Sequence, residues 1–275
     1  MSVLLYKTPA GPVMEVSGQA YSVVPADWDT LLNMPGLMHH LLRQAVPQNA
    51  IDTPSEIEAP IGKQEVWGAG VTYYKSREAR MQEASETGGS DFYDRVYEAA
   101  RPELFFKANA HRVAAPCGPL RLRRDSSWIV PEPEWTLVIN SAGEIIGYTI
   151  GNDLTCRDIE SENPLYLPQA KTWDGCASIG PGLLIQDTGM PSSTRIQLEV
   201  RRSGKTVCSV ATALSELKRD TQELLQYLTR ETSFPAGCFL MTGTGIVPED
   251  SFSLQPGDEV RITIEPIGTL INTTA

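Results

Sequence analysis

The stretch SSWIVPEPEWTLVINSAGEIIGYTIGNDLTCRD, residues 126–158, decides which fold this sequence predicts. Residues 135–140 (WTLVIN) and 145–150 (IIGYTI) are apolar and rich in β-branched side chains, which is typical of strands. Residues 141–144 (SAGE) between them are turn-forming. The stretch therefore predicts a β-hairpin, and its register determines whether the acidic residues at its open end meet.

The register of this hairpin depends on the length of its turn. A two-residue turn and a four-residue loop give the same pairing, which places Glu132 opposite Asp153 and Glu134 opposite Gly151. Glu132 and Glu134 share a face because side chains alternate along a strand. Directly opposed residues also share a face, with Cβ atoms roughly 4.5–5.5 Å apart. A three-residue turn would shift the register by one residue and separate the acids.

Three carboxylates on one face of a sheet repel one another unless a positive charge neutralises them. An isolated Glu-x-Glu is more typical of a solvated strand end, but the third acid favours a bound cation. All the ligands are oxygen, with no histidine or cysteine among them, which favours Mg²⁺, with Mn²⁺ or Ca²⁺ as alternatives, over zinc. We therefore predict that Glu132, Glu134 and Asp153 bind a divalent metal ion.

The charge of the chain limits its partners. The 275 residues carry a net charge of −11, from 23 basic and 34 acidic residues. Phosphate contacts need clustered Lys and Arg, so this charge argues against nucleic acid and against an anionic membrane surface. No run approaches the ~18 apolar residues of a membrane span. We expect neither nucleic acid nor a membrane as a partner.

The cysteine pattern indicates a reduced compartment. Of the five cysteines, no two lie at C-x-x-C spacing and none has a neighbouring histidine. They are typical of small buried hydrophobic side chains. The N-terminal MSVLLYKTPAGP lacks the apolar region of a signal peptide. We therefore expect a cytoplasmic protein.

Residues 1–60 are expected to form a small N-terminal α/β domain. Short strands are predicted at 2–6 and 21–24, and a helix at 27–45 that Pro-Gly in its middle must bend or split. Residues 47–60 carry three prolines and are typical of a linker.

Residues 61–275 are expected to form a second, catalytic domain. Short strands punctuated by Gly and Pro dominate it, with helices predicted at 76–85, 91–100 and 215–230. The fold class is therefore α+β, with a mixed β-roll or barrel-like core.

Five motifs together resemble the fumarylacetoacetate hydrolase family. They are GAGVTYYKSREAR (68–80), PELFFKA (102–108), VPEPEW (130–135), GYTIGNDLTCRDIE…NPLYLPQAKTWDGCASIGP (147–181) and MTGTGIVPED (241–250). The resemblance implies a Mg²⁺-binding β-roll fold that acts on 2-oxo acids and their enols. It also implies a homo-oligomer, which we expect to be a homodimer or a homotetramer.

The resemblance assigns roles by position. The three acids match the metal ligands, and Lys171, in a proline-bounded stretch expected to be extended, matches the active-site lysine. Thr244, between Gly243 and Gly245, matches the substrate-contacting threonine. Its hydroxyl and the backbone N–H groups of the loop, including that of Gly243, would hold a substrate carboxylate. An ordinary surface lysine and a simple turn are the alternatives.

Two further charges near the motif PELFFKA are candidates. Glu103 is a candidate general base, and Lys107 is a candidate contact for the substrate carboxylate. A charge pair at a strand edge explains both equally well. Arg157 and Asp158, shortly after the third acid, are expected to pair with each other.

The chain departs from the hydrolase pattern at one place. Hydrolases and decarboxylases of the family often carry a histidine near the start of the core, where this chain has Ser76. The histidines of this chain, His39, His40 and His111, lie outside that motif. The sequence SREAR instead resembles the dehydratase branch of the family.

The resemblance thus implies a Mg²⁺-dependent dehydratase of a 2-keto-3-deoxy sugar acid, such as 2-keto-3-deoxy-D-arabinonate, giving 2-oxoglutarate semialdehyde. The metal would polarise the ketone, Glu103 would take the C3 proton, and Lys171 would assist the departure of the C4 hydroxyl. The alternatives are a carbon–carbon hydrolase or a 2-oxo acid decarboxylase of the same family, and a non-catalytic binding protein.

Overall fold

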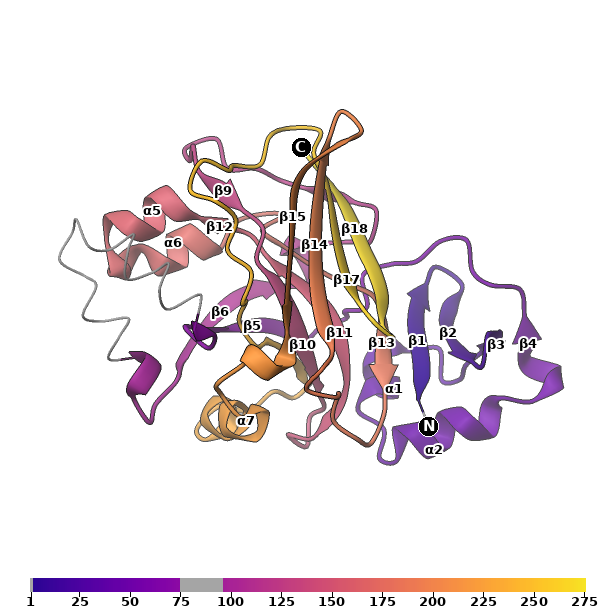
Figure 1. Ribbon diagram of the computed structural model, residues 1–275. Helices are drawn as coiled ribbons and strands as arrows, with labels where there is room; N and C mark the ends of the chain where they lie inside the picture. The colour runs from indigo at the N-terminus through magenta and orange to yellow at the C-terminus, as the bar shows by residue number, and fades with distance from the viewer. Residues whose placement is uncertain (1, 75–95) are drawn as a thin grey trace.

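A computed structural model describes residues 2–74 and 96–275 (Figure 1). The helix predicted at 76–85 lies outside the described residues, as do residues 91–95 of the one predicted at 91–100. Of its described residues 96–100, 96–98 are helical. No helix in the described part of the chain is long and apolar enough to cross a membrane.

Within the described residues, eleven strands form one mixed sheet in the order β4-β3-β2-β1-β13-β11-β10-β16-β5-β6, with β7 beside β13. Most neighbours are antiparallel, whereas β16 with β5 and β13 with β7 are parallel. The strands are β1 (Val3–Thr8), β2 (Gly11–Val16), β3 (Gln19–Ser22), β4 (Ala50–Ile51), β5 (Glu65–Gly70), β6 (Glu103–Asn109), β7 (Val113–Ala114), β10 (Pro133–Ile139), β11 (Ile145–Asp153), β13 (Ala177–Ile185) and β16 (Cys238–Met241).

A second sheet of five strands has the order β15-β14-β17-β18-β8 among the described residues, and β9 pairs with β12 alone. The expected α+β class with mixed sheets is confirmed. These strands are β8 (Pro119–Leu120), β9 (Ile129–Val130), β12 (Thr155–Cys156), β14 (Arg195–Arg202), β15 (Lys205–Ala213), β17 (Glu259–Ile264) and β18 (Gly268–Thr274).

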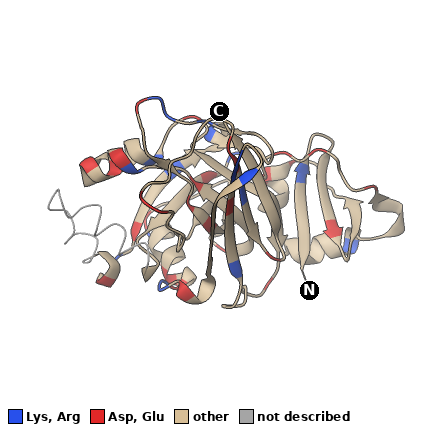
Figure 2. Cartoon of the chain, turned by 45° about the horizontal axis from the view of Figure 1, so that its top comes forward, with Lys and Arg blue, Asp and Glu red and all other residues tan. Residues whose placement is uncertain are grey.

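Short helices lie at the two ends of the main sheet. Figure 1 shows α2 with strands β1 to β4 on one side of the molecule and α5 with α6 on the opposite side. The α-helices that lie wholly within the described residues are α1 (Trp28–Leu32), α2 (Leu37–Gln44), α5 (Arg157–Glu162), α6 (Leu167–Lys171) and α7 (Thr221–Thr229). The 3₁₀ helices described there are η1 (Pro47–Asn49), η2 (Ala110–Arg112), η3 (Pro164–Tyr166) and η4 (Leu214–Glu216). Figure 2 shows basic and acidic residues interspersed over these elements.

Helix α7 begins later than predicted. The helix expected from position 215 starts at Thr221, because the Asp220 side chain accepts the N–H groups of Gln222 (2.8 Å) and Glu223 (3.2 Å). Such a cap stabilises the first helical turn by about 1 kcal/mol. The preceding residues form the 3₁₀ helix η4 instead.

The N-terminal residues extend the main sheet. Strand β1 pairs antiparallel with β13, with Leu4 opposite Leu184. Strand β2 was not predicted from the sequence, whereas the predicted bend at Pro35-Gly36 does separate α1 from α2. The division of the chain into residues 1–60 and 61–275 stays a prediction.

A hydrophobic cluster covers each face of the main sheet. Leu137 belongs to the cluster that includes Leu198 of the second sheet. The next residue, Val138, belongs to the cluster that includes Leu31 of α1. Because side chains alternate along a strand, Glu134 lies on the same face as Val138. The acidic end of the hairpin therefore continues the face that packs against the N-terminal helices.

The turn of the central hairpin differs from both predicted forms. The Asn140 N–H donates to Glu144 O and the Gly143 N–H donates to Asn140 O, each at 3.0 Å, which closes a three-residue turn. Gly143 has a φ of +76°, which glycine adopts without strain. Next to this turn, Ile145 lies opposite Ile139, whereas the predicted register placed it opposite Asn140.

A β-bulge compensates for the shorter turn. Val138 lies opposite Gly147, so Ile146 is an extra residue in β11 and the register moves back by one. Beyond the bulge Glu134 lies opposite Gly151, as predicted. Bulges of this kind change the register at the cost of one unpaired residue. The expected turn was therefore wrong, while the expected register at the open end is confirmed.

Candidate metal centre and active site

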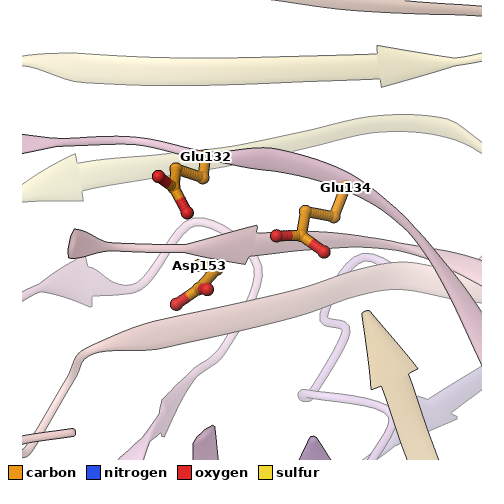
Figure 3. A group of neighbouring side chains, drawn as sticks. All are labelled: Glu132, Glu134 and Asp153. Carbon is orange, nitrogen blue, oxygen red and sulfur yellow. The ribbon is translucent and has the colours of Figure 1, made fainter. Parts of the chain in front are cut away.

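Three carboxylates meet at the open end of the hairpin (Figure 3). Glu134 lies in β10, Glu132 directly precedes that strand, and Asp153 ends β11. The Asp153 N–H donates to Glu132 O at 3.0 Å, which continues the hairpin to this pair. One carboxylate oxygen from each residue lies within 4.8 Å of the other two. The three side chains are 4 %, 2 % and 0 % exposed for Glu132, Glu134 and Asp153, so the predicted convergence is confirmed in a buried setting.

Two cations contact this trio from the helical segment that follows the hairpin. Lys171 Nζ donates to Glu132 Oε2 and, at 3.0 Å, to Asp153 Oδ2. Arg157 Nη2 donates to Glu132 Oε1 at 3.2 Å. The sequence suggested that Arg157 pairs with Asp158. In the structure Arg157 pairs with the site carboxylate of Glu132 instead. Asp158 instead accepts from the Ser126 hydroxyl at 2.6 Å.

Lys171 reaches the trio from a helix. The stretch around it was expected to be extended, but residues 167–171 form α6, with Pro168 in its first turn and Lys171 as its last residue. Proline is favoured at the start of a helix because the N–H it lacks has no partner there. The helix packs beside α5, which carries Arg157.

The trio lies in the wall of a cavity. Glu103, Lys171, Gly243 and Thr244 line the same cavity, so four of the predicted residues come together with the acids. No histidine is found among the described residues that line it. Lys107 is not part of this lining and is fully buried.

The loop at Gly243 and Thr244 closes one side of the cavity. The Gly243 N–H donates to Glu134 Oε2 at 2.5 Å. Gly243 has a φ of +92°, and a Cβ there would lie 2.0 Å from Thr72 Oγ1, so this position requires glycine. Thr244 Oγ1 accepts the N–H of Ile246 at 3.1 Å. Gly243 therefore holds a carboxylate of the protein, and Thr244 faces the cavity.

Glu103 occupies space that a neighbouring glycine leaves free. A Cβ on Gly70, opposite Glu103 in the sheet, would lie 2.2 Å from Glu103 Oε2. The carboxylate therefore lies over the glycine, in the lining of the cavity.

The sequence did not indicate two buried charged residues of the cavity lining as site residues. Arg157 and Glu160 both line the cavity and are 3 % and 4 % exposed. Glu160 Oε2 accepts the Thr155 hydroxyl at 3.1 Å. Their spacing of three residues directly after Asp153 was the available signal, since residues i and i+3 share a helix face.

The electrostatics of the trio fit a bound cation. The pKa of Glu134 is raised well above its ordinary value, first by burial and then by the negative charges of Asp153 and Glu132. Lys171 and the Gly243 N–H act in the opposite direction and do not offset the rise. Carboxylate oxygens are among the ligands that Mg²⁺ prefers. The residues present therefore fit this ion.

The raised pKa predicts a pH-dependent stability. In the metal-free protein the folded state keeps a proton on Glu134 in a pH range where the unfolded chain has lost it. The free energy of unfolding should therefore fall as the pH rises from the ordinary glutamate pKa towards the folded-state pKa. Mg²⁺ needs the ionised carboxylate, so the stabilisation it provides should grow with pH. Thermal denaturation with EDTA or MgCl₂ over a pH series measures this, and a Mg²⁺-induced shift that is constant with pH would contradict it.

Comparison with known protein families identifies the family of this chain. Residues 66–275 match the family described as fumarylacetoacetate (FAA) hydrolase C-terminal. The chain belongs to the fumarylacetoacetate hydrolase family. The resemblance inferred from the motifs is confirmed, and the two mixed sheets are the fold of this family.

Named relatives of this fumarylacetoacetate hydrolase family member include dehydratases. A probable 2-keto-3-deoxyxylonate dehydratase from Haloferax volcanii is 47% identical over 214 residues, which are 78% of this chain and 73% of the relative. A 2-dehydro-3-deoxy-D-arabinonate dehydratase from Saccharolobus solfataricus is 42% identical over 217 residues, with the same coverage of 78% and 73%. A solved structure of 2-keto-3-deoxy-D-arabinonate dehydratase complexed with magnesium and 2,5-dioxopentanoate has a TM-score of 0.84 at 32% identity, and covers 100% of this chain and 98% of that one.

Proposed function

We propose that this protein is a Mg²⁺-dependent dehydratase that converts 2-keto-3-deoxy-D-arabinonate into 2-oxoglutarate semialdehyde. The observation that carries the proposal is the similarity along the whole chain to a dehydratase structure that contains magnesium and 2,5-dioxopentanoate. 2,5-Dioxopentanoate is another name for 2-oxoglutarate semialdehyde. The buried acid trio and Lys171 support the assignment independently, because they offer oxygen ligands beside an amine.

The two sugar acids named for the relatives lead to the same substrate in the D series. A 2-keto-3-deoxy acid has lost the stereocentres at C2 and C3, and C4 is the one that distinguishes D from L. D-Arabinonate and D-xylonate therefore yield one compound, and both relatives support one substrate for this chain.

Glu132, Glu134 and Asp153 would hold the Mg²⁺ ion. When bound, the ion would polarise the 2-oxo group and make the C3 protons acidic. Thr244 faces the cavity, and we propose that its hydroxyl contacts the substrate carboxylate.

Glu103 and Lys171 would carry out the proton transfers. Both line the cavity, and in the proposed reaction Glu103 takes a proton from C3 while Lys171 Nζ protonates the departing C4 hydroxyl. This leaves a double bond between C3 and C4. Transfer of a proton from C5 to C3 then gives an enol with its double bond between C4 and C5. The hydroxyl proton of this enol is lost and C4 gains a proton, which produces the C5 aldehyde, so atoms balance with the loss of one water.

We also propose a cytoplasmic homodimer or homotetramer. The five cysteines are all free, and Cys156, Cys176 and Cys238 are buried, which supports a reducing compartment. The oligomer is implied by the family, and light scattering of the purified protein would measure its size.

A substrate panel tests the proposed function. With added Mg²⁺, 2-keto-3-deoxy-D-arabinonate should be consumed with formation of the semialdehyde, whereas acylpyruvates should not be cleaved and oxaloacetate should not be decarboxylated. Cleavage of acylpyruvates without dehydration would favour the hydrolase alternative. Absence of Mg²⁺ binding in calorimetry, together with no turnover, would favour a non-catalytic binding protein.

A further inference from the structure

Lys107 is a buried lysine placed by a β-bulge. In the pairing of β5 with β6, Trp67 lies opposite Phe106 and Val66 lies opposite Ala108, which leaves Lys107 as the unpaired residue. Its side chain is 0 % exposed and does not line the cavity. A bulge changes the direction of the side chain it carries, and bulges are frequent beside active sites. The bulge here accompanies a charged side chain that reaches Asp153 of the acid trio.

The ammonium group of Lys107 is surrounded by acceptors of the protein. Nζ donates to Leu154 O at 2.8 Å and to Lys171 O. Lys107 Nζ also lies 2.5 Å from Asp153 Oδ1. The two atoms form a close ion pair, but they do not meet the geometry of a hydrogen bond. Nζ lies 5.1 Å from the centre of the Trp173 ring. A buried ammonium with three oxygen contacts is held in place, because moving it would leave buried charges unpaired.

This arrangement divides the two oxygens of Asp153. Oδ1 contacts Lys107, while Oδ2 accepts from Lys171. Lys171 ends a short helix at the cavity, but Lys107 is enclosed by protein. Asp153 therefore offers Oδ2 to a metal ion on the cavity side, where Lys171 contacts it, whereas Oδ1 is occupied by the enclosed Lys107.

We propose that Lys107 makes this site selective for Mg²⁺ over Ca²⁺ by keeping Asp153 Oδ1 out of the coordination shell. Mg²⁺ binds six ligands in a strict octahedron, in which each carboxylate contributes one oxygen. Ca²⁺ takes six to eight oxygens and often binds both oxygens of a carboxylate. The inference rests on the proposed metal site, and it is independent of the dehydration reaction.

The affinity ratio of the two ions isolates this role. Removing the charge of Lys107 changes the electrostatic attraction for every divalent cation by a similar amount, so single affinities mix several effects. The ratio of the Kd for Ca²⁺ to the Kd for Mg²⁺ cancels that common part. It reports the number of oxygens that the site offers, and a general loss of stability does not change it.

The first test needs no substitution. Calorimetric titration of the metal-free full-length protein with MgCl₂ and with CaCl₂ should give tighter binding of Mg²⁺ by about tenfold or more. Equal or tighter binding of Ca²⁺ overturns the inference. A protein that binds neither ion overturns the proposed metal site itself, so the two failures are distinguishable.

The second test replaces the lysine. In Lys107→Met, and in Lys107→Gln as a second variant that keeps donors for the carbonyl groups, the affinity ratio should shift towards Ca²⁺ by about tenfold. Lys107→Arg, which keeps the positive charge, should retain the ratio of the unsubstituted protein. An unchanged ratio in a folded Met or Gln variant overturns the inference. If neither variant folds, the titration of the unsubstituted protein decides.

Arg202 provides a matched control. It forms a two-pronged ion pair with Asp258, which is 0 % exposed, through Nε and Nη2 at 2.8 Å each. Arg202→Met therefore also leaves a buried carboxylate without its cation, but outside the cavity lining. Thermal stability should fall, while the affinity ratio stays within about twofold of the unsubstituted protein. A shift as large as that of Lys107→Met would attribute the effect to destabilisation and overturn the inference.

Discussion

Glu132→Gln is expected to abolish Mg²⁺-dependent turnover, with a fall in kcat/KM of about 10³-fold or more. The substitution keeps the size of the side chain and removes one of three carboxylate charges. A metal ligand contributes several kcal/mol to transition-state stabilisation, and each 1.36 kcal/mol corresponds to a factor of ten. Glu132 also accepts from both Lys171 and Arg157, so its loss leaves two buried cations with one partner fewer. Turnover over a series of Mg²⁺ concentrations, with calorimetry of Mg²⁺ binding, measures the effect.

Glu144→Gln is the matched control for this prediction. Glu144 is exposed at the turn of the same hairpin, and its carboxylate accepts from Asn140 Nδ2 at 2.9 Å, a contact that the amide oxygen of glutamine can keep. The Glu144→Gln substitution removes one negative charge, as Glu132→Gln does, but from the opposite end of the hairpin. Activity should therefore stay within about twofold of the unsubstituted protein. Full activity of Glu132→Gln would refute the assignment of the trio as the metal site.

Lys171→Met is expected to lower kcat by about 10²- to 10⁴-fold, which is the usual contribution of a positioned acid or base. Its effect on the metal should be opposite to that of Glu132→Gln. Lys171 Nζ contacts Glu132 and Asp153, so its removal takes a competing cation away and leaves every carboxylate present. Mg²⁺ affinity should therefore be unchanged or higher, while the chemical step is lost.

The measurement for Lys171→Met combines calorimetry with single-turnover kinetics at saturating Mg²⁺. Lys205→Met, on the exposed start of β15, removes the same charge at a distance and should leave both quantities unchanged. Loss of Mg²⁺ binding in Lys171→Met would show that the lysine supports the metal site rather than the proton transfer. Unchanged kcat would remove Lys171 from the proposed mechanism.

The central hairpin shows how a correct register can follow from an incorrect turn. The predicted turn length was wrong by one residue, and the bulge at Ile146 restored the pairing of Glu134 with Gly151. The alternation of buried and polar side chains explains why, since a slip of one residue would turn every side chain to the opposite face. Register is thus specified by the burial pattern along the strands, whereas a turn and a bulge can compensate for each other without a clear sequence signal.

The helix around Lys171 shows a different limit. Lys171 follows a proline, and sequence alone indicated an extended, proline-bounded segment, whereas residues 167–171 form a helix. The five-residue helix is too short to be stable by itself. Packing of α6 beside α5 supports this helix, and so does the hydrogen bond that Lys107 Nζ donates to Lys171 O. Such a helix exists because of tertiary contacts, so propensity could not predict it.

The sequence by itself determined the acid trio, because Glu132, Glu134 and Asp153 belong to one hairpin whose pairing follows from alternation within a single local stretch. Only the tertiary structure decided what surrounds the trio. Gly243 and Lys107 reach it from segments far away along the chain, and no periodicity relates their positions to the hairpin. The position of Lys107 in particular depends on a bulge, and the structure places this residue beside Asp153, while its contact with the substrate stays a prediction. Long-range packing and buried charge pairing, rather than local pattern, therefore complete this site.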